Sequence, residues 1–172
     1  MAEISWTRRS YQAGVLLIPL DHEARSWTGA QAQALAGITV ADEALLPAQR
    51  RFEPEPVPDS GEGRAVSSPL DHALHGADVV VLFTLDLGAV DREAVSQIGD
   101  TARLSGTLLG AIVVSPGARW ERPGAHDAMT GIREAADNVV ILKDDGFVLP
   151  FLHVLRGGPQ ENASGGLAGV AP

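Results

Sequence analysis

Polar side chains gather in three loops that each follow a short apolar run. The loops span residues 84–91, 115–122 and 143–146, and each preceding run is expected to be a buried strand. Ligands of open parallel sheets bind beyond the carboxyl ends of the strands, so these loops should border one crevice. The candidate ligand-binding residues are Thr84, Asp86, Gly88, Asp91, Ser115, Arg119, Glu121, Arg122 and Asp144.

The charges in these loops allow two interpretations. Arg119 and Arg122 facing Asp86 could hold an anionic ligand, or a metal through a bridging phosphate. In the other interpretation, Asp91 caps a helix, the arginines are solvated and the loops only turn the chain. The residue types alone leave both interpretations open.

No catalytic group, metal or cofactor is expected from the motifs. His72 and His75 have the i, i+3 spacing that places two imidazoles on one helix face, but this spacing fits no well-known metal motif. The chain has no cysteine, which excludes disulfides, thiol nucleophiles and cysteine-ligated metals. It also has no nucleophile elbow, no Walker A sequence and no Gly-x-Gly-x-x-Gly.

Composition favours one domain in the cytoplasm. The chain has 172 residues, 45% of them hydrophobic, which suits a single core. We expect one domain at 14–156, which contains a proline-rich acidic loop at 47–63. An N-terminal extension at 1–13 should precede this domain, and a disordered glycine-rich tail at 157–172 should follow it. The net charge of -9 disfavours nucleic-acid binding. No segment approaches the roughly 20 apolar residues of a membrane span, so no membrane partner is expected either.

Strand and helix signals alternate along the chain. Apolar runs predict strands at 15–20, 79–83, 108–114 and 139–142, with a weak one at 38–40. Apolar spacing and caps predict helices at 69–75, 90–102 and 125–136, and a further short helix from Thr28, as N-cap, to Gly37. This alternation predicts an α/β fold: a three-layer sandwich with a mostly parallel sheet and helices on both faces, Rossmann-like in type.

The order of several segments resembles the GTPase domain of FtsZ, the bacterial tubulin homologue. The residues that carry the resemblance are Gly76-Ala77-Asp78 before a strand, the strand at 108–116, Glu121 after Trp120, and Gly131-Ile132-Arg133-Glu134. It covers about residues 14–145 and implies an FtsZ-like fold. The family's glycine-rich loop corresponds to 87–93, where only Gly88 remains, while Asp91 and Glu93 would repel a phosphate. The family's first strand and first glycine-rich loop are also missing if the strand at 15–20 matches its second.

The resemblance therefore implies a fold that has lost GTP binding and hydrolysis. The expected function is a non-catalytic, FtsZ-like module that binds a protein partner or itself, with no cofactor. The alternative is a small-molecule-binding protein or enzyme that reuses the crevice, with Asp86, Asp91, Arg119, Glu121 and Arg122 as its working groups. A third interpretation is a structural subunit whose missing first strand comes from a partner.

Overall fold

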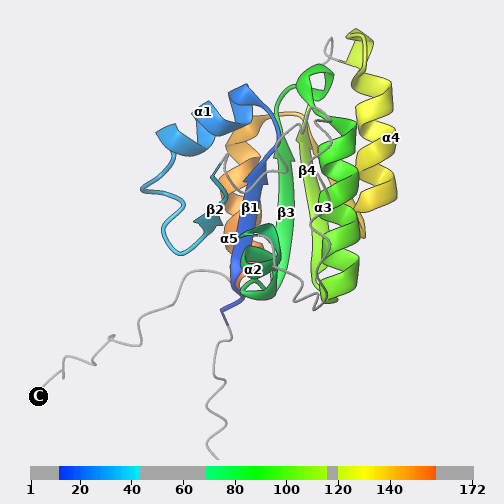
Figure 1. The fold of residues 1–172 in the computed structure, drawn as a ribbon. Helices are drawn as coiled ribbons and strands as arrows, with labels where there is room; N and C mark the ends of the chain where they lie inside the picture. The colour runs from blue at the N-terminus through cyan, green and yellow to red at the C-terminus, as the bar shows by residue number, and fades with distance from the viewer. Residues whose placement is uncertain (1–11, 43–68, 116–119, 158–172) are drawn as a thin grey trace, which may run out of the picture.

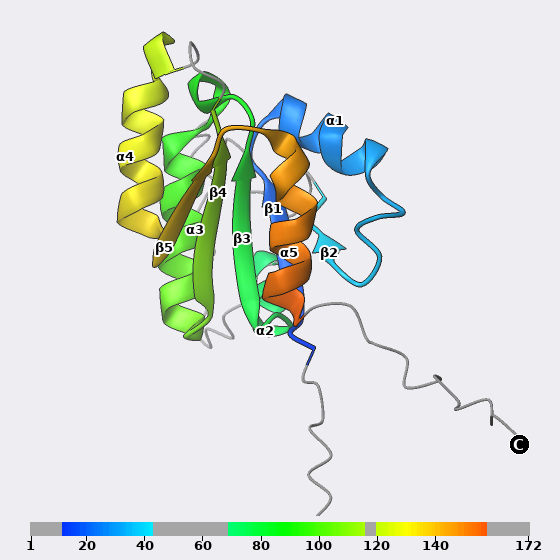
Figure 2. The same ribbon diagram turned by 180° about the vertical axis from the view of Figure 1, so that it is seen from behind.

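The protein is built around one five-stranded sheet in which every strand pair is parallel. The computed structural model describes residues 12–42, 69–115 and 120–157. The strand order is β2-β1-β3-β4-β5; Figure 1 labels the first four of these strands and Figure 2 also labels β5. The strands are β1 (Val15–Pro19), β2 (Thr39–Val40), β3 (Val79–Thr84), β4 (Leu108–Val114) and β5 (Asn138–Leu142).

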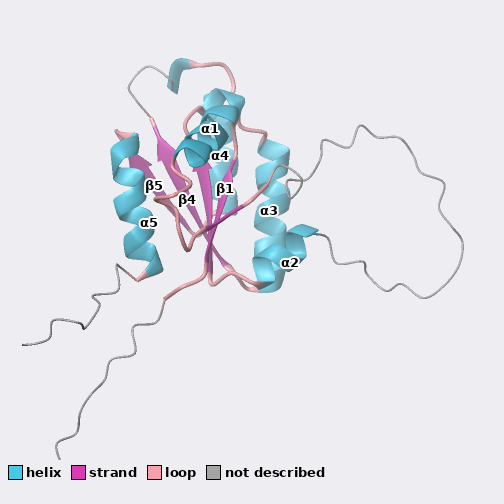
Figure 3. Ribbon diagram, turned by 90° about the vertical axis from the view of Figure 1, so that its left-hand side faces the viewer, coloured by secondary structure: helices cyan, strands magenta, loops and turns pink. Residues whose placement is uncertain are grey.

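Helices cover both faces of this sheet. They are α1 (His22–Ala30), α2 (Pro69–His75), α3 (Arg92–Ser105), α4 (Ala125–Ala135) and α5 (Val148–Arg156), with short 3-10 turns η2 (Leu87–Ala89) and η4 (Asp145–Phe147). The side view in Figure 3 places α5 on one side of the sheet and α2 and α3 on the other. The predicted three-layer α/β fold with a parallel sheet is confirmed.

Alternating side chains of the central strands build two cores. Val80 and Leu82 of β3 belong to the core beneath α2, α3 and α4, whereas Val81 and Phe83 belong to the core beneath α1 and α5. On the second face, the ring of Trp27 from α1 meets Phe83 edge to face, with the ring centroids 5.1 Å apart. A strand that is buried on both faces reads as a continuous apolar run, which is why β3 stands out in the sequence.

Helices α3 and α4 approach most closely at a glycine. A Cβ atom on Gly99 would lie 2.8 Å from the Cβ of Ala135 and 3.1 Å from its Cα, which is inside van der Waals contact. Gly99 is itself buried in α3. The missing side chain therefore sets the spacing of the two helices that flank the site described below.

Two helices differ from the expectation. The helix expected to start at Thr28 begins instead at His22, because Asp21 accepts a hydrogen bond from the backbone N–H of Ala24 (2.9 Å) and so caps it. The Thr28 hydroxyl donates to the carbonyl of Arg25 inside the helix. The sequence patterns did not indicate α5. This helix contains Pro150, which lies in the first turn, where a proline is tolerated.

Several expected features lie outside the described residues. These are nearly all of the N-terminal extension, the proline-rich acidic loop at 47–63 and the glycine-rich tail. Within the described ranges, none of the helices is both long and apolar enough to cross a membrane.

Candidate functional site

The order of the strands locates a crevice between the ends of β1 and β3. After β1 the chain enters α1 on one face and continues to β2, whereas after β3 it enters α3 on the other face and continues to β4. The two chain segments thus leave neighbouring strands in opposite directions. In sheets of order 2-1-3-4-5, this reversal is where ligands bind.

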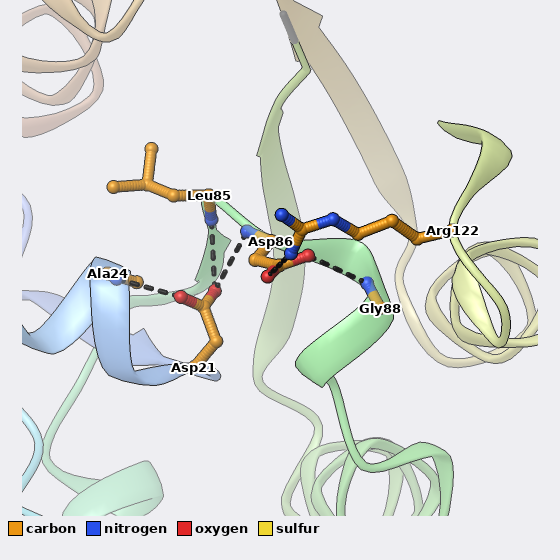
Figure 4. A network of polar contacts seen from close by, with 6 residues as sticks. All are labelled: Asp21, Ala24, Leu85, Asp86, Gly88 and Arg122. Carbon is orange, nitrogen blue, oxygen red and sulfur yellow. Dashed lines mark hydrogen bonds and ion pairs between the residues drawn. The ribbon is translucent and has the colours of Figure 1, made fainter. Parts of the chain in front are cut away.

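Asp21 joins the two sides of this reversal. Its side chain is buried, with 3% of its surface exposed, and it follows β1 directly. One carboxylate oxygen accepts the N–H of Ala24 in α1, and the other accepts the N–H groups of Leu85 (3.0 Å) and Asp86 (3.4 Å) beyond β3 (Figure 4). The sequence analysis did not select Asp21. Its signal was an aspartate between an apolar run and a helix, the usual position of an N-cap.

Asp86 lies next to Asp21 and is paired with an arginine. Its side chain is 11% exposed; one carboxylate oxygen accepts the N–H of Gly88 (3.1 Å) and the other forms an ion pair with Arg122. A Cβ atom on Gly88 would lie 3.2 Å from the Cβ of Arg122, so glycine allows η2 to approach the segment before α4. The structure thus brings together Asp86, Gly88 and Arg122 from two of the predicted loops.

Two buried hydroxyl groups lie near this pair. Thr84 is 1% exposed and Ser115 is 9% exposed, and neither side-chain oxygen has a hydrogen-bond partner within the described residues. Thr84 pairs with Val113 in the sheet, and Ser115 is two residues further along, so both side chains lie on the face covered by α3 and α4. A buried hydroxyl without a partner costs about 1–3 kcal/mol, so within the described residues Thr84 and Ser115 are the groups at this end of the sheet that could still bond a polar ligand or a water.

The other predicted site residues have different roles. Asp91 caps α3 by accepting the N–H groups of Glu93 (2.9 Å) and Ala94 (3.4 Å), as the second interpretation of the charges expected. Asp144 accepts the N–H of Gly146. Glu121 is exposed in the turn before α4. Arg119 lies outside the described residues.

Several backbone amides of the described residues at this end of the sheet are already bound. Asp21, Asp86, Asp91 and Asp144 each accept at least one N–H group that an anionic ligand would otherwise use. No group of three or more histidines and carboxylates within the described ranges could hold a metal. The Nδ1 atom of His75 lies 2.7 Å from the carbonyl oxygen of Asp71 in its own helix.

A separate hollow lies beside α1. Its volume is about 460 Å³, and it is lined mainly by apolar side chains, with Arg25, Thr28 and Asp42 as the polar ones. It shares no lining residue with the contacts of Asp21, Asp86 and Arg122. We place the candidate site at the strand ends, because the buried hydroxyls and the strand reversal both lie there.

Fold and site together define a doubly wound α/β protein whose strand order is that of flavodoxin-like folds. No protein-family model matches the sequence, and a search of curated proteins found no match. Among solved structures, the chain is similar to the FMN-dependent cysteine decarboxylase SpaF, with 17% sequence identity, a TM-score of 0.38, and coverage of 79% of this chain and 87% of that chain.

The expected relationship to FtsZ is wrong. No family model supports it, and the solved structure reported above is an FMN-dependent enzyme, neither FtsZ nor tubulin. The resemblance also implied that a strand is missing next to β1. In the structure β1 is paired on one side with β2 and on the other with β3, so no strand is missing there. The interpretation as a degenerate FtsZ-like GTPase that acts through protein interaction or assembly is therefore wrong. The interpretation as a subunit whose missing strand comes from a partner is wrong for the same reason.

Proposed function

We propose that this protein binds a small polar molecule, neutral or cationic, in the crevice at the carboxyl ends of β1, β3 and β4, as a binding protein or as an enzyme. The observation that carries the proposal is the pair of buried hydroxyls, Thr84 and Ser115, that have no hydrogen-bond partner within the described residues. Each hydroxyl can both donate and accept, so the pair suits a ligand with hydroxyl, amide or amine groups.

The charges around the crevice support a ligand without negative charge. Asp21 and Asp86 are both buried there, and Arg122 is paired with Asp86 in the described structure. Two like charges 4 Å apart repel by about 4 kcal/mol at an effective dielectric constant of 20. A phosphate at this position would meet that repulsion, with the amides already bound to carboxylates.

Arg122 supplies directional donors at the rim of the crevice. Its side chain is about half exposed, and one of its nitrogen atoms is held by Asp86. The guanidinium has five N–H donors in a fixed plane, so the remaining ones are oriented by the ion pair. These donors suit a carbonyl or hydroxyl oxygen of the same ligand.

A thermal-shift experiment tests the proposal. We would measure the unfolding temperature with a panel of polyols, amides and primary amines, and with matched carboxylates and phosphates that include FMN and GTP. A neutral or cationic compound should raise the unfolding temperature, and Thr84→Val or Ser115→Ala should remove the shift. Thr130→Val is the matched control, because the Thr130 hydroxyl is bonded to its own helix at His126. Stabilisation by phosphates alone, or a shift that survives both crevice variants, would contradict the proposal.

The compartment is a separate proposal. The cytoplasmic location expected from the sequence stays a prediction, and cell fractionation with an antibody against the native chain would test it.

A further inference from the structure

Helix α5 is apolar on more than the face that it buries. Val148 and Leu152 are fully buried against the sheet. Val154 is 71% exposed, and Phe147, directly before the helix, is 62% exposed. A helix that is apolar almost all round is normally covered on more than one side.

The exposed apolar residues form one stripe on a defined side of α5. Phe147, Phe151 and Val154 are spaced i, i+4 and i+7, so they lie along the same side of the helix; Phe151, in the middle, is partly buried against the core beneath α1 and α5. Arg156 projects from the opposite side, where its guanidinium donates to the carbonyl of Ala36 (2.6 Å) near β2. The stripe therefore faces the other half of the sheet, which is formed by β4 and β5.

That half of the sheet has no helix over it. Figure 2 shows α5 lying across β1 and β3, with no helix of the described residues drawn over β4 and β5 on this face. Ile112 and Val114 of β4 are nevertheless buried in the core beneath α1 and α5, so the uncovered part is the start of β4 together with β5. Leu109 and Val139 pack on the opposite face, so alternation places their neighbours Leu108 and Val140 on the uncovered one. Leu108 is 55% exposed, and Val140 and Leu142 are partly exposed.

We propose that the stripe and the uncovered half-sheet form the interface of a homodimer. The stripe is Phe147, Phe151 and Val154, and the half-sheet is Leu108, Val140 and Leu142. Both lie side by side on one chain, so one two-fold axis places each copy's stripe on the other copy's half-sheet and covers both at once. None of the six residues is charged, and charged residues are depleted in the centre of protein interfaces.

The exposed area fits this assignment. Phe147, Val154 and Leu108 are 62%, 71% and 55% exposed, so these three present roughly 300 Å² of apolar surface, taking about 200 Å² for a complete phenylalanine and less for valine and leucine, and the three partly exposed side chains add to it. A stable dimer buries about 800 Å² per partner, of which about two thirds is apolar. The surface thus supplies most of the apolar area that such an interface needs.

Light scattering coupled to size-exclusion chromatography tests the dimer with the full chain. The native protein should elute with the mass of two chains at micromolar concentration. Val154→Asp and Leu108→Asp should each raise the dissociation constant roughly 100-fold or more, because two-fold symmetry buries each unpaired charge twice. Leu104→Asp is the control, since Leu104 is 90% exposed on α3 and should leave the mass unchanged.

Single cysteines identify what covers the surface, because the chain has none of its own. In separate Val154→Cys and Leu108→Cys chains, alkylation by iodoacetamide should slow as protein concentration rises, whereas Leu104→Cys should react at a constant rate. A monomeric mass at every concentration would overturn the proposal. So would slow alkylation that is independent of concentration, because it would mean that another segment of the same chain covers the surface.

Discussion

The carboxylate of Asp21 accepts the backbone N–H of Leu85 at 3.0 Å, across the point where the chain leaves β1 and β3 in opposite directions. The two residues are 64 positions apart in the sequence. This contact places a negative charge of the protein itself in the crevice where sheets of this order bind their ligands. It joins the two segments that leave β1 and β3, and under the proposed function it disfavours anionic ligands.

Replacing Asp21 should destabilise the protein more than removing an ordinary helix cap. Asp21→Ala leaves three backbone N–H groups without their acceptor, two of them outside α1, so we expect the free energy of unfolding to fall by about 2–4 kcal/mol. Asp91→Ala is the control, because the hydrogen bonds described above join Asp91 to the first turn of α3, and it should cost about 1 kcal/mol. Urea unfolding followed by circular dichroism measures both. Equal losses would show that the contact to β3 contributes nothing.

The two buried hydroxyls should be dispensable for folding. Thr84→Val and Ser115→Ala remove groups that have no partner within the described residues, so the unfolding free energy should stay within about 0.5 kcal/mol or rise. Thr28→Val is the matched control: Thr28 is also buried, but its hydroxyl donates to Arg25, so its loss should cost about 1 kcal/mol. A loss of 1–3 kcal/mol at Thr84 or Ser115 would indicate that the hydroxyl is bonded in the free protein.

Any side chain at Gly99 should separate α3 from α4. Gly99→Ala places a Cβ 2.8 Å from the Cβ of Ala135. Because the opposing atoms belong to a helix, the backbone must move, and we expect the free energy of unfolding to fall by about 1–3 kcal/mol. Gly29→Ala provides the comparison, since Gly29 lies in α1 with no atom near the new Cβ and should gain up to about 1 kcal/mol from helix propensity. The measurement is the unfolding temperature of both variants under the same conditions. Similar changes in the unfolding temperature at Gly99 and Gly29 would contradict the close approach of α3 and α4.

The ion pair between Asp86 and Arg122 should contribute modestly to stability. Because the Arg122 side chain is 51% exposed, solvent weakens the attraction, and a double-mutant cycle with Asp86→Ala and Arg122→Ala should give a coupling energy of about 0.5–1 kcal/mol. Raising the salt concentration should reduce the coupling, since exposed charges are screened. Chemical denaturation of the four proteins at low and high salt provides the values. A coupling energy near zero at low salt would mean that the pair has no energetic role.

Much of the local structure could be predicted from local signals. The strand at Leu108–Val114 and the helix that begins at Ala125 agree with the apolar pattern, because a buried strand or an amphipathic helix needs a fixed spacing of apolar residues. The helix after β1 was misplaced because Thr28 has the form of a cap in sequence, but Asp21 is the residue whose side chain meets the free amides. Asp86 and Arg122 were predicted to face each other; Asp21, between them and α1, was missed.

The sequence by itself determined the class of fold, since alternating strands and helices permit little else than a parallel sheet with helices on both faces. The order of the strands depended on the tertiary structure. Parallel α/β proteins share the same succession of elements, so a resemblance in order and spacing pointed to FtsZ, whereas the pairing of β1 with β3 defines a different sheet. The meeting of Asp21 with Leu85 depends on that pairing. Only packing between distant segments could place the carboxylate in the crevice.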